Sequence, residues 1–162
     1  QWWAKDPIFD RNIRDQFLET HFQASQGELF LWRATIEGRL AEIIVLDQFS
    51  RNIYRDLPSS FSQDPMALAL AQEAVALGLD QELDAVQRSF LYLPYMHSES
   101  KQIHQVAEKL FDSLNNQKSL DFERQHKAII DRFGRYPHRN AILGRQSTLE
   151  EIEFLKQPGS GF

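Results

Sequence analysis

The spacing of apolar residues along the chain predicts helices from its beginning. Phe9, Ile13 and Phe17 recur every four residues, which places them on one face of a helix. The preceding pair Asp6-Pro7 is typical of a helix start, because aspartate caps free N–H groups and proline fits the first helical position. Asp64-Pro65 has the same pattern and predicts the start of a second helix of this kind.

Apolar stripes with the same period predict three further helices, over residues 36–44, 103–114 and 122–133. Gly78 and Gly134 follow such stripes directly. Glycine adopts the left-handed conformation that commonly ends a helix, so both glycines are predicted helix ends.

The remaining segments extend the helical pattern. Residues 80–93 predict one or two shorter helices that end at Pro94, and residues 147–151 hold two overlapping capping boxes. No stretch alternates with a period of two for long enough to predict a sheet, and no repeat of about 34 residues is evident. We therefore predict a single all-α domain over residues 1–162, with seven or eight helices in a bundle or in stacked hairpins and a loose tail at 157–162.

Composition narrows the chemistry. The chain has 162 residues, of which 42% are hydrophobic and 25% charged, a globular balance. It has no cysteine, which excludes disulfides, thiolate nucleophiles and cysteine-ligated metals. It also lacks the glycine-rich nucleotide-binding motifs and the H-E-x-x-H zinc motif, so we expect neither a cofactor nor a metal.

The sequence contains no signal peptide and no apolar run near the length of a membrane span, so we expect a cytoplasmic protein that does not enter membranes. It begins at Gln1 rather than at methionine. We therefore expect a further segment to precede it.

Charge is distributed unevenly. The net charge is −5, which argues against a nucleic-acid surface. Residues 124–145, however, contain six basic residues and one acid, so this segment carries +5 and the rest of the chain carries −10. This contrast predicts a local site for an anion.

Two polar residues fall where a helix would be expected to present apolar ones. Asp47 follows Ile43 by four residues and precedes Arg51 by four, and His126 follows Phe122 by four. A buried carboxylate needs a partner. Asp47 is therefore either part of a structural ion pair with Arg51 or a pocket carboxylate, and His126 is either a core histidine or a titratable pocket residue.

Residues 95–99 follow a proline and predict the start of a helix, capped by Ser98 or Ser100. Free N–H groups at a helix start attract anions, and His97 would add a tunable donor there. A capping role alone is the alternative for this segment.

The segment 134–140 reads Gly-Arg-Tyr-Pro-His-Arg-Asn, a turn that combines two arginines with a histidine and an asparagine. Arginine forks bind carboxylates and phosphates in bidentate fashion. The functional interpretation is an anion-binding loop. The alternative is a solvated basic turn that pairs with acids such as Asp47 or Glu99.

Five segments together resemble a known family. They are W-W-x-K-D-x-x-F-D-x-x-I-R at 2–14, L-D-Q-F-x-R-N-I-Y-R at 46–55, D-P-x-A-L-A at 64–69, R-x-F-L-Y-L-P-x-M-H-S-E at 88–99, and H-x-x-I-I-x-R-F-G-R-Y-P-H-R-N-x-I-L-G-R-x-S-T-x-E-E at 126–151. The chain resembles the domain of unknown function 924 family over nearly its whole length.

This resemblance implies a multihelical, tetratricopeptide-like fold with stacked helix hairpins, in a mostly bacterial family without an established activity. Members usually carry an aromatic segment upstream of the tryptophans, which is absent here. The family's motif positions fall on Asp47, Gln48, Arg51, Asn52, Arg88, His97, Ser98, Glu99, His126, Arg135, His138, Arg139 and Asn140.

Two functional hypotheses follow. The first is a binding protein for an anionic small molecule or an acidic peptide, in a pocket where segments 47–52, 97–99 and 134–140 converge. The predicted ligand-binding residues are Arg51, Asn52, Arg88, Ser98, Arg135, His138, Arg139 and Asn140.

The second hypothesis is a hydrolase in which His97 or His126 acts as a general base, oriented by Asp47 or Glu99. Ser98 is the available nucleophile next to these groups. The sequence leaves the ligand and the oligomeric state undetermined.

Overall fold

A computed structural model describes residues 6–161, and all of the regular structure in this range is helical. The α-helices are α1 (Pro7–Ser25), α2 (Ile36–Ile44), α3 (Ser50–Ile53), α4 (Asp64–Ala76), α5 (Ala85–Met96), α6 (Lys101–Asp112), α7 (Gln117–Phe133) and α8 (Leu149–Leu155). The π-helical turn η2 (Val45–Phe49) joins α2 to α3, so these three elements form one continuous helix. Counted this way, residues 6–161 form seven α-helices, and the all-α prediction is confirmed.

Short 3-10 turns connect several of the helices. They are η1 (Phe30–Ala34), η3 (Pro58–Phe61), η4 (Leu79–Glu82) and η5 (Pro137–Arg139).

Most helix ends follow from local sequence chemistry. The Asp6 side chain accepts hydrogen bonds from two N–H groups of the first turn of α1, and Pro7 is its first residue. Gly78 and Gly134 follow α4 and α7 with φ of 71° and 70°. Thr148 caps α8 in a capping box. These predicted boundaries are confirmed.

The predicted end of α5 is wrong. Pro94 lies inside this helix, which continues to Met96 and has His97 as its C-cap. His97 therefore ends one helix instead of starting the next, and the N-cap of α6 is Ser100, whose side chain makes no capping hydrogen bond. Residues 91–96 are all buried, and this burial outweighs the one backbone hydrogen bond that proline removes.

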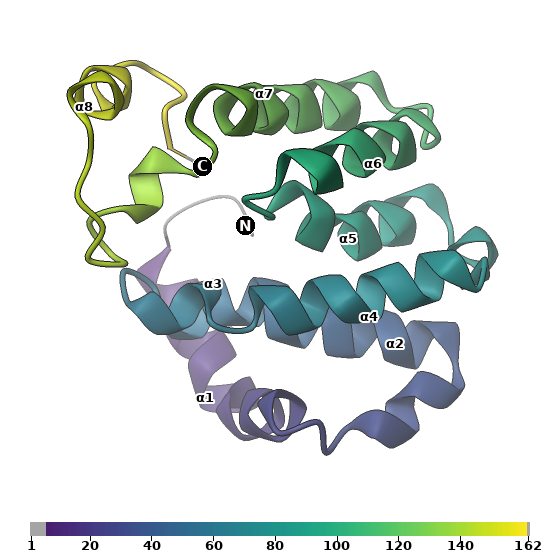
Figure 1. Ribbon diagram of the computed structural model, residues 1–162. Coiled ribbons are helices and arrows are strands. Elements are labelled where there is room, and N and C mark those ends of the chain that lie inside the picture. The colour runs from purple at the N-terminus through teal and green to yellow at the C-terminus, as the bar shows by residue number, and fades with distance from the viewer. Residues whose placement is uncertain (1–5, 162) are drawn as a thin grey trace.

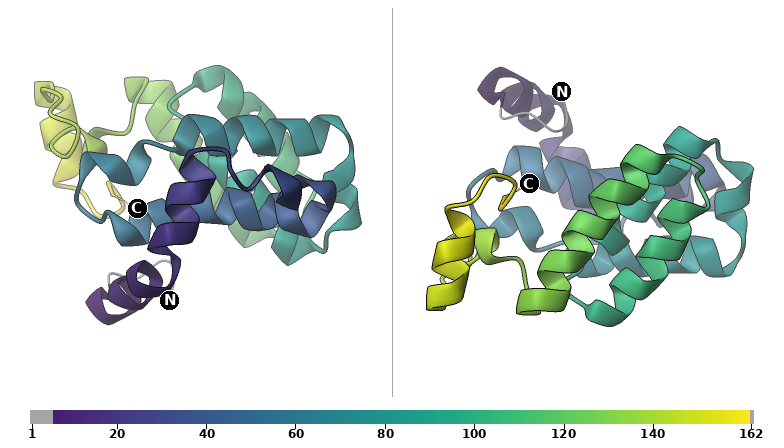
Figure 2. Two further views of the ribbon diagram at one scale, coloured as in Figure 1. Left: turned by 90° about the horizontal axis from the view of Figure 1, so that it is seen from below. Right: turned by 90° about the horizontal axis from the view of Figure 1, so that it is seen from above.

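The helices stack in successive layers. In Figure 1, α7, α6, α5 and α4 lie one below another, and α2 lies beside α4. Both views of Figure 2 show α1 and α8 on the same side of this stack, at the left. The layering is compatible with stacked helix hairpins. Neighbouring helices alternate in direction. The C-terminal ends of α3, α5 and α7 therefore lie on the same side of the stack as the N-terminal ends of α4 and α6.

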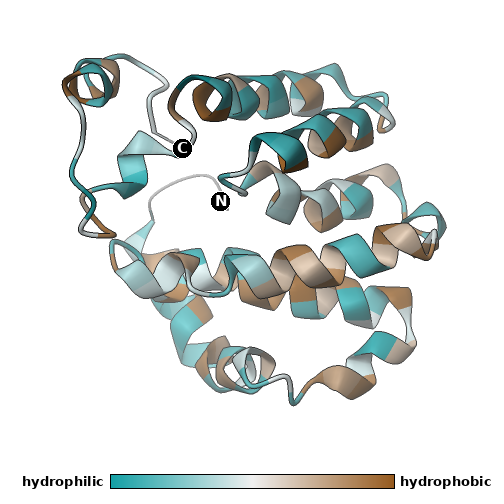
Figure 3. Ribbon diagram, in the orientation of Figure 1, coloured by the Kyte–Doolittle hydropathy of each residue, from teal (hydrophilic) through white to brown (hydrophobic). Residues whose placement is uncertain are grey.

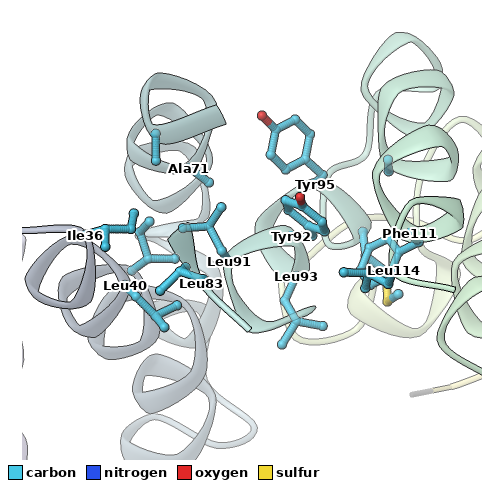
Figure 4. Packing of buried hydrophobic residues seen from close by; sticks show 14 of the residues in the cluster. Ile36, Leu40, Ala71, Leu83, Leu91, Tyr92, Leu93, Tyr95, Phe111 and Leu114 are labelled. Carbon is cyan, nitrogen blue, oxygen red and sulfur yellow. The ribbon is translucent and has the colours of Figure 1, made fainter. Parts of the chain in front are cut away.

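The main core lies between α2, α4, α5 and α6. Leu40, Leu91, Tyr92 and Phe111 are buried there, as Figure 4 shows. The rings of Tyr92 and Phe111 meet edge to face, with centroids 5.9 Å apart. Coloured by hydropathy, α6 shows hydrophilic and hydrophobic residues interleaved along its length, as its amphipathic pattern predicts (Figure 3).

A second, smaller core forms where α1 packs on η2 and α3, with Ile13, Leu46 and Phe49 buried. Beyond α8, the Ser160 hydroxyl donates a hydrogen bond to the carbonyl of Leu155, so the predicted tail turns back to that helix at Ser160. Residue 162 and residues 1–5 lie outside the described range. No helix within residues 6–161 combines the length and apolar character needed to cross a membrane.

We expect Phe111→Ala to lower the free energy of unfolding by about 3–5 kcal/mol, because Phe111 is 1% exposed and its removal leaves a cavity. Phe122→Ala is the matched control, since Phe122 is 43% exposed, and we expect it to lose under about 1 kcal/mol. Urea unfolding of both variants measures the difference. Equal losses would contradict the position of the core.

Candidate functional site

The end of α5 is a buried helix terminus whose last carbonyls are bound by side chains from other elements. The three consecutive carbonyls of Met96–Ser98 face three donors. The Tyr136 hydroxyl donates to the first (2.5 Å), Arg139 Nη2 to the second (3.1 Å) and His104 Nε2 to the third (2.9 Å). Carbonyls at a helix end have no partner within the helix, so these side chains complete the C-terminus of α5. These hydrogen bonds also fix the backbone of residues 96–98, and with it the position of His97.

His97 is paired with Asp47, fifty residues earlier in the chain. His97 Nδ1 lies 2.8 Å from Asp47 Oδ1, and the Gln48 side chain donates to the other carboxylate oxygen. Asp47 and Gln48 belong to the π-helical turn η2, a distortion that is frequent at functional sites.

The environment of this pair sets its protonation. Burial raises the pKa of Asp47, but the charge of Arg51 and the contacts with His97 and Gln48 outweigh it and hold the pKa well below the usual range. Burial lowers the pKa of His97, and the nearby Arg51 charge lowers it further. At neutral pH, His97 is therefore a neutral imidazole that donates through Nδ1 to Asp47 and presents an unprotonated Nε2.

Two arginines converge on one carboxylate next to this pair. Arg51 binds both oxygens of Asp64 at 3.0 and 3.1 Å, and Arg139 Nη1 lies 3.2 Å from Asp64 Oδ2. Arg51 also reaches Asp47 Oδ1 at 3.3 Å, which links the two groups. The Phe61 ring lies against both guanidinium groups, at 4.5 Å from Arg139 and 5.7 Å from Arg51.

Asp64 has a role in this cluster that its sequence context does not indicate. The Asp64-Pro65 pair is a common capping pattern, so it predicted a helix start and gave no reason to seek a distant partner. In the structure Gln63 is the N-cap, and the Asp64 side chain turns to the arginines instead. Arg51 and Asp64 have side chains 21% and 16% exposed, so solvent reaches this edge of the cluster.

Arg139 is the least compensated charge in the cluster. Its side chain is 7% exposed, and its buried Nε has no hydrogen-bond partner among residues 6–161. Burial lowers the pKa of Arg139, and the neighbouring Arg51 charge lowers it further. An additional negative charge at this point would therefore be stabilised.

Tyr136 lies inside the segment 134–140, but its sequence context does not indicate its role in the cluster. Its fully buried ring packs against Arg139, His126 and His138. Burial raises the pKa of the Tyr136 hydroxyl, and its backbone N–H donates to Glu99 at 2.7 Å. Tyr136 thus connects the turn to α5, α6 and α7.

His126 and His138 are neutral at physiological pH. Burial lowers the pKa of His126 to about 3 and that of His138 to about 4. His126 Nδ1 donates to the carbonyl of Phe122 in the preceding turn of α7. The structure thus places His126 among buried, hydrogen-bonded groups, as the core interpretation describes.

Several predicted site residues lie elsewhere or are bound to other groups. Asn52 donates to Asp10 of α1 at 2.9 Å. Arg88 lies nine residues before His97 on α5, about 13 Å along the axis, and donates to Tyr92 and Ser113.

The turn that follows α7 is held by ion pairs of its own. Arg135 forms a bidentate pair with Glu151 at 2.7 Å, and Asn140 donates to the same carboxylate. Glu99 pairs with Arg145 at 2.6 and 2.9 Å. Ser98 takes part through its backbone carbonyl. Among the predicted residues, the structure therefore brings together Asp47, Arg51, His97 and Arg139.

The basic segment 124–145 is matched by carboxylates. Its ion pairs are Arg124–Glu108, Lys127–Asp131, Arg132–Glu150, Arg135–Glu151, Arg139–Asp64 and Arg145–Glu99. The +5 charge of this segment is therefore neutralised by neighbouring carboxylates and does not form a free basic surface. Arg139 and its neighbour Arg51 remain as the charges that could attract an anion. Within residues 6–161, no group of three or more His, Cys, Asp or Glu side chains is arranged to hold a metal ion.

Comparison with known proteins gives the family. A family model described as "Bacterial protein of unknown function (DUF924)" matches residues 1–159. A solved structure of a protein of unknown function from Agrobacterium tumefaciens is 39% identical, with a TM-score of 0.91 over 96% of this chain and 88% of that chain. No curated protein matches the sequence. Because the family model spans nearly the whole chain, this protein belongs to the DUF924 family of bacterial proteins.

Proposed function

We propose that the cluster at the end of α5 binds a ligand through an anionic group held between Arg51 and Arg139. One observation carries this proposal. Two guanidinium groups from distant segments converge on a single carboxylate, that of Asp64. This is the arrangement in which proteins bind the carboxylate or phosphate of a ligand.

Asp64 acts in this proposal as an internal occupant that the ligand displaces. Its contacts of 3.0 to 3.2 Å with the arginines are longer than the usual charge-assisted hydrogen bond, and its side chain reaches solvent. Arg139 contributes the uncompensated charge that an incoming anion would neutralise. The positive charge of Arg139, which Asp64 neutralises only in part, would thus stabilise the bound ligand.

The charge pattern favours a small anion or a peptide carboxylate over a polyanion. A nucleic acid needs a continuous basic surface, whereas each basic residue of 124–145 is paired with a carboxylate. We also propose a cytoplasmic location, with which the absence of cysteine is compatible.

A second function is favoured by the Asp47–His97 pair. A carboxylate 2.8 Å from Nδ1 holds the imidazole in the tautomer whose Nε2 accepts a proton, which is the geometry of a general base. In this alternative the ligand is a substrate. Its anionic group binds the arginines while His97 activates water for hydrolysis.

Anion binding is tested by calorimetry with inorganic phosphate, acetate and a short peptide with a free C-terminal carboxylate. We expect Asp64→Asn to tighten binding at least about tenfold, because it removes the internal competitor but keeps its shape, and Arg139→Gln to weaken binding by a similar factor. Asp131→Asn is the matched control, since Asp131 is an exposed carboxylate paired with Lys127, and it should leave affinity unchanged.

Equal affinities in the three variants and the unmodified protein would overturn this binding site. Tighter binding in Asp131→Asn as well as Asp64→Asn would show that net charge alone, rather than the Arg51–Arg139 pair, attracts the anion.

The general-base alternative is tested with a panel of chromogenic esters. Hydrolysis requires neutral His97, whose pKa lies below 6.5, so we expect the rate to fall as pH decreases through the acidic range and to be level around pH 7. His97→Gln should abolish this activity, and Asp47→Asn should reduce it at least about a hundredfold through loss of the tautomer. The control His126→Asn should keep the same pH profile, and a profile that His97→Gln leaves unaltered would exclude the alternative.

A further inference from the structure

A second histidine–carboxylate pair lies between α6 and α7, in the interior of the protein. His104 and Glu123 both have side chains that are 0% exposed, and His104 Nδ1 lies 2.7 Å from Glu123 Oε1. Neither residue was singled out by the sequence. The pair is inaccessible to a ligand, so its chemistry concerns the protein itself.

The hydrogen bonds around His104 fix one of its protons. Its Nε2 lies 2.9 Å from the carbonyl of Ser98, which can only accept. The Tyr136 oxygen lies 3.2 Å from the same nitrogen, but its own hydrogen is donated to the carbonyl of Met96. Both neighbours therefore accept, and Nε2 carries a hydrogen.

The contact between His104 Nδ1 and Glu123 Oε1 needs one more proton. With a hydrogen on Nε2 only, neutral His104 presents a lone pair at Nδ1, and an ionised Glu123 would present another lone pair against it at 2.7 Å. A proton on either group turns this repulsion into a hydrogen bond. The geometry therefore requires the pair to hold one proton beyond that on Nε2.

The surroundings place that proton on Glu123. Its second oxygen, Oε2, is buried and has no hydrogen-bond partner among residues 6–161. An ionised carboxylate there would leave a charged oxygen without solvent or donor, which is far more costly than a neutral carboxylic acid. Burial also raises the pKa of Glu123 above its usual value, against the lowering effect of His104.

The ionisable groups packed around the pair do not supply a compensating buried charge. They are Glu108 from α6, Lys127, Asp131 and His126 from α7, and Tyr136 from the following turn. Glu108 raises the pKa of Glu123 and Lys127 lowers it, and Lys127 is itself paired with Asp131 on the protein surface. His126 and Tyr136 are uncharged at neutral pH.

We propose that the His104–Glu123 pair retains a proton at neutral pH and that this proton locks the turn between α5 and α6. His104 holds the carbonyl of Ser98, which directly follows His97. Loss of the proton at alkaline pH makes His104 and Glu123 repel each other and loosens this turn. The position of His97 in the candidate site is thereby coupled to pH.

The proposal has a quantitative consequence for folding. Well above pH 6.5 an unfolded chain has ionised glutamates and neutral histidines, so these two side chains hold only the single N–H proton of the imidazole, whereas the folded pair holds one proton more. Stability therefore falls as pH rises. The folding equilibrium constant decreases about tenfold per pH unit until the folded pair loses its proton.

Glu123→Gln tests this directly, because the glutamine amide donates to His104 Nδ1 as the carboxylic acid does but cannot lose a proton. Urea unfolding between pH 6.5 and 9 is measured for the unmodified protein, for Glu123→Gln and for the control Glu108→Gln. Glu108 is a partly exposed acid paired with Arg124 on the same helix pair. We expect the folding equilibrium constant of the unmodified protein and of Glu108→Gln to fall with pH. For each pH unit, the fall should be about ten times larger than the change in Glu123→Gln.

Parallel pH curves for all three proteins would overturn the proposal. A measurement on the unmodified protein covers the case in which Glu123→Gln does not fold. The ¹³C chemical shift of the Glu123 carboxyl group at pH 7 should be that of a carboxylic acid, and the shift of a carboxylate would equally overturn it.

Discussion

The constraint on which the structure depends is the burial of the C-terminal end of α5. A helix leaves its last carbonyls without intrahelical partners, and inside a protein these groups need donors. Tyr136, Arg139 and His104 provide them for three successive carbonyls, and they come from two elements that follow in sequence, α6 and the turn after α7. The hydrogen bonds at this one buried helix end therefore fix the positions of α5, α6 and the turn after α7 relative to one another.

The same constraint creates the chemistry of the site. Arg139 is buried where it donates to the carbonyl of His97, and a buried guanidinium needs a counter-charge. Asp64 supplies it and is shared with Arg51, which in turn lies against Asp47 and so connects to His97. The cluster is thus a chain of alternating charges contributed by the 134–140 turn, α4, α3 and η2, and it ends at the neutral His97 after α5. Arg51 and Asp64 form its solvent-facing edge, where we propose that a ligand binds.

How far the site was predictable differs from residue to residue. Asp47 was recognisable because it occupies an apolar helix position, and the segment 134–140 because of its composition. His97 was identified but placed at a helix start, since a proline three residues earlier normally ends a helix. Asp64 and Tyr136 were missed because each has a common local explanation, a helix cap and a core aromatic residue. Glu123 carried no signal, because an acid on a charged helix looks solvent-exposed until its neighbours are known.

The sequence by itself determined the helices of this protein, most of their ends and its family. Those features depend on hydrogen bonds, caps and apolar spacing within a few residues, which can be read along the chain. Tertiary structure alone decided which charges meet. Arg139 and Asp64 are 75 residues apart and His97 and Asp47 are 50, and many other opposite charges were available to each. Only the packing of the helices selects these partners, because it removes water from some pairs and leaves the rest at the surface.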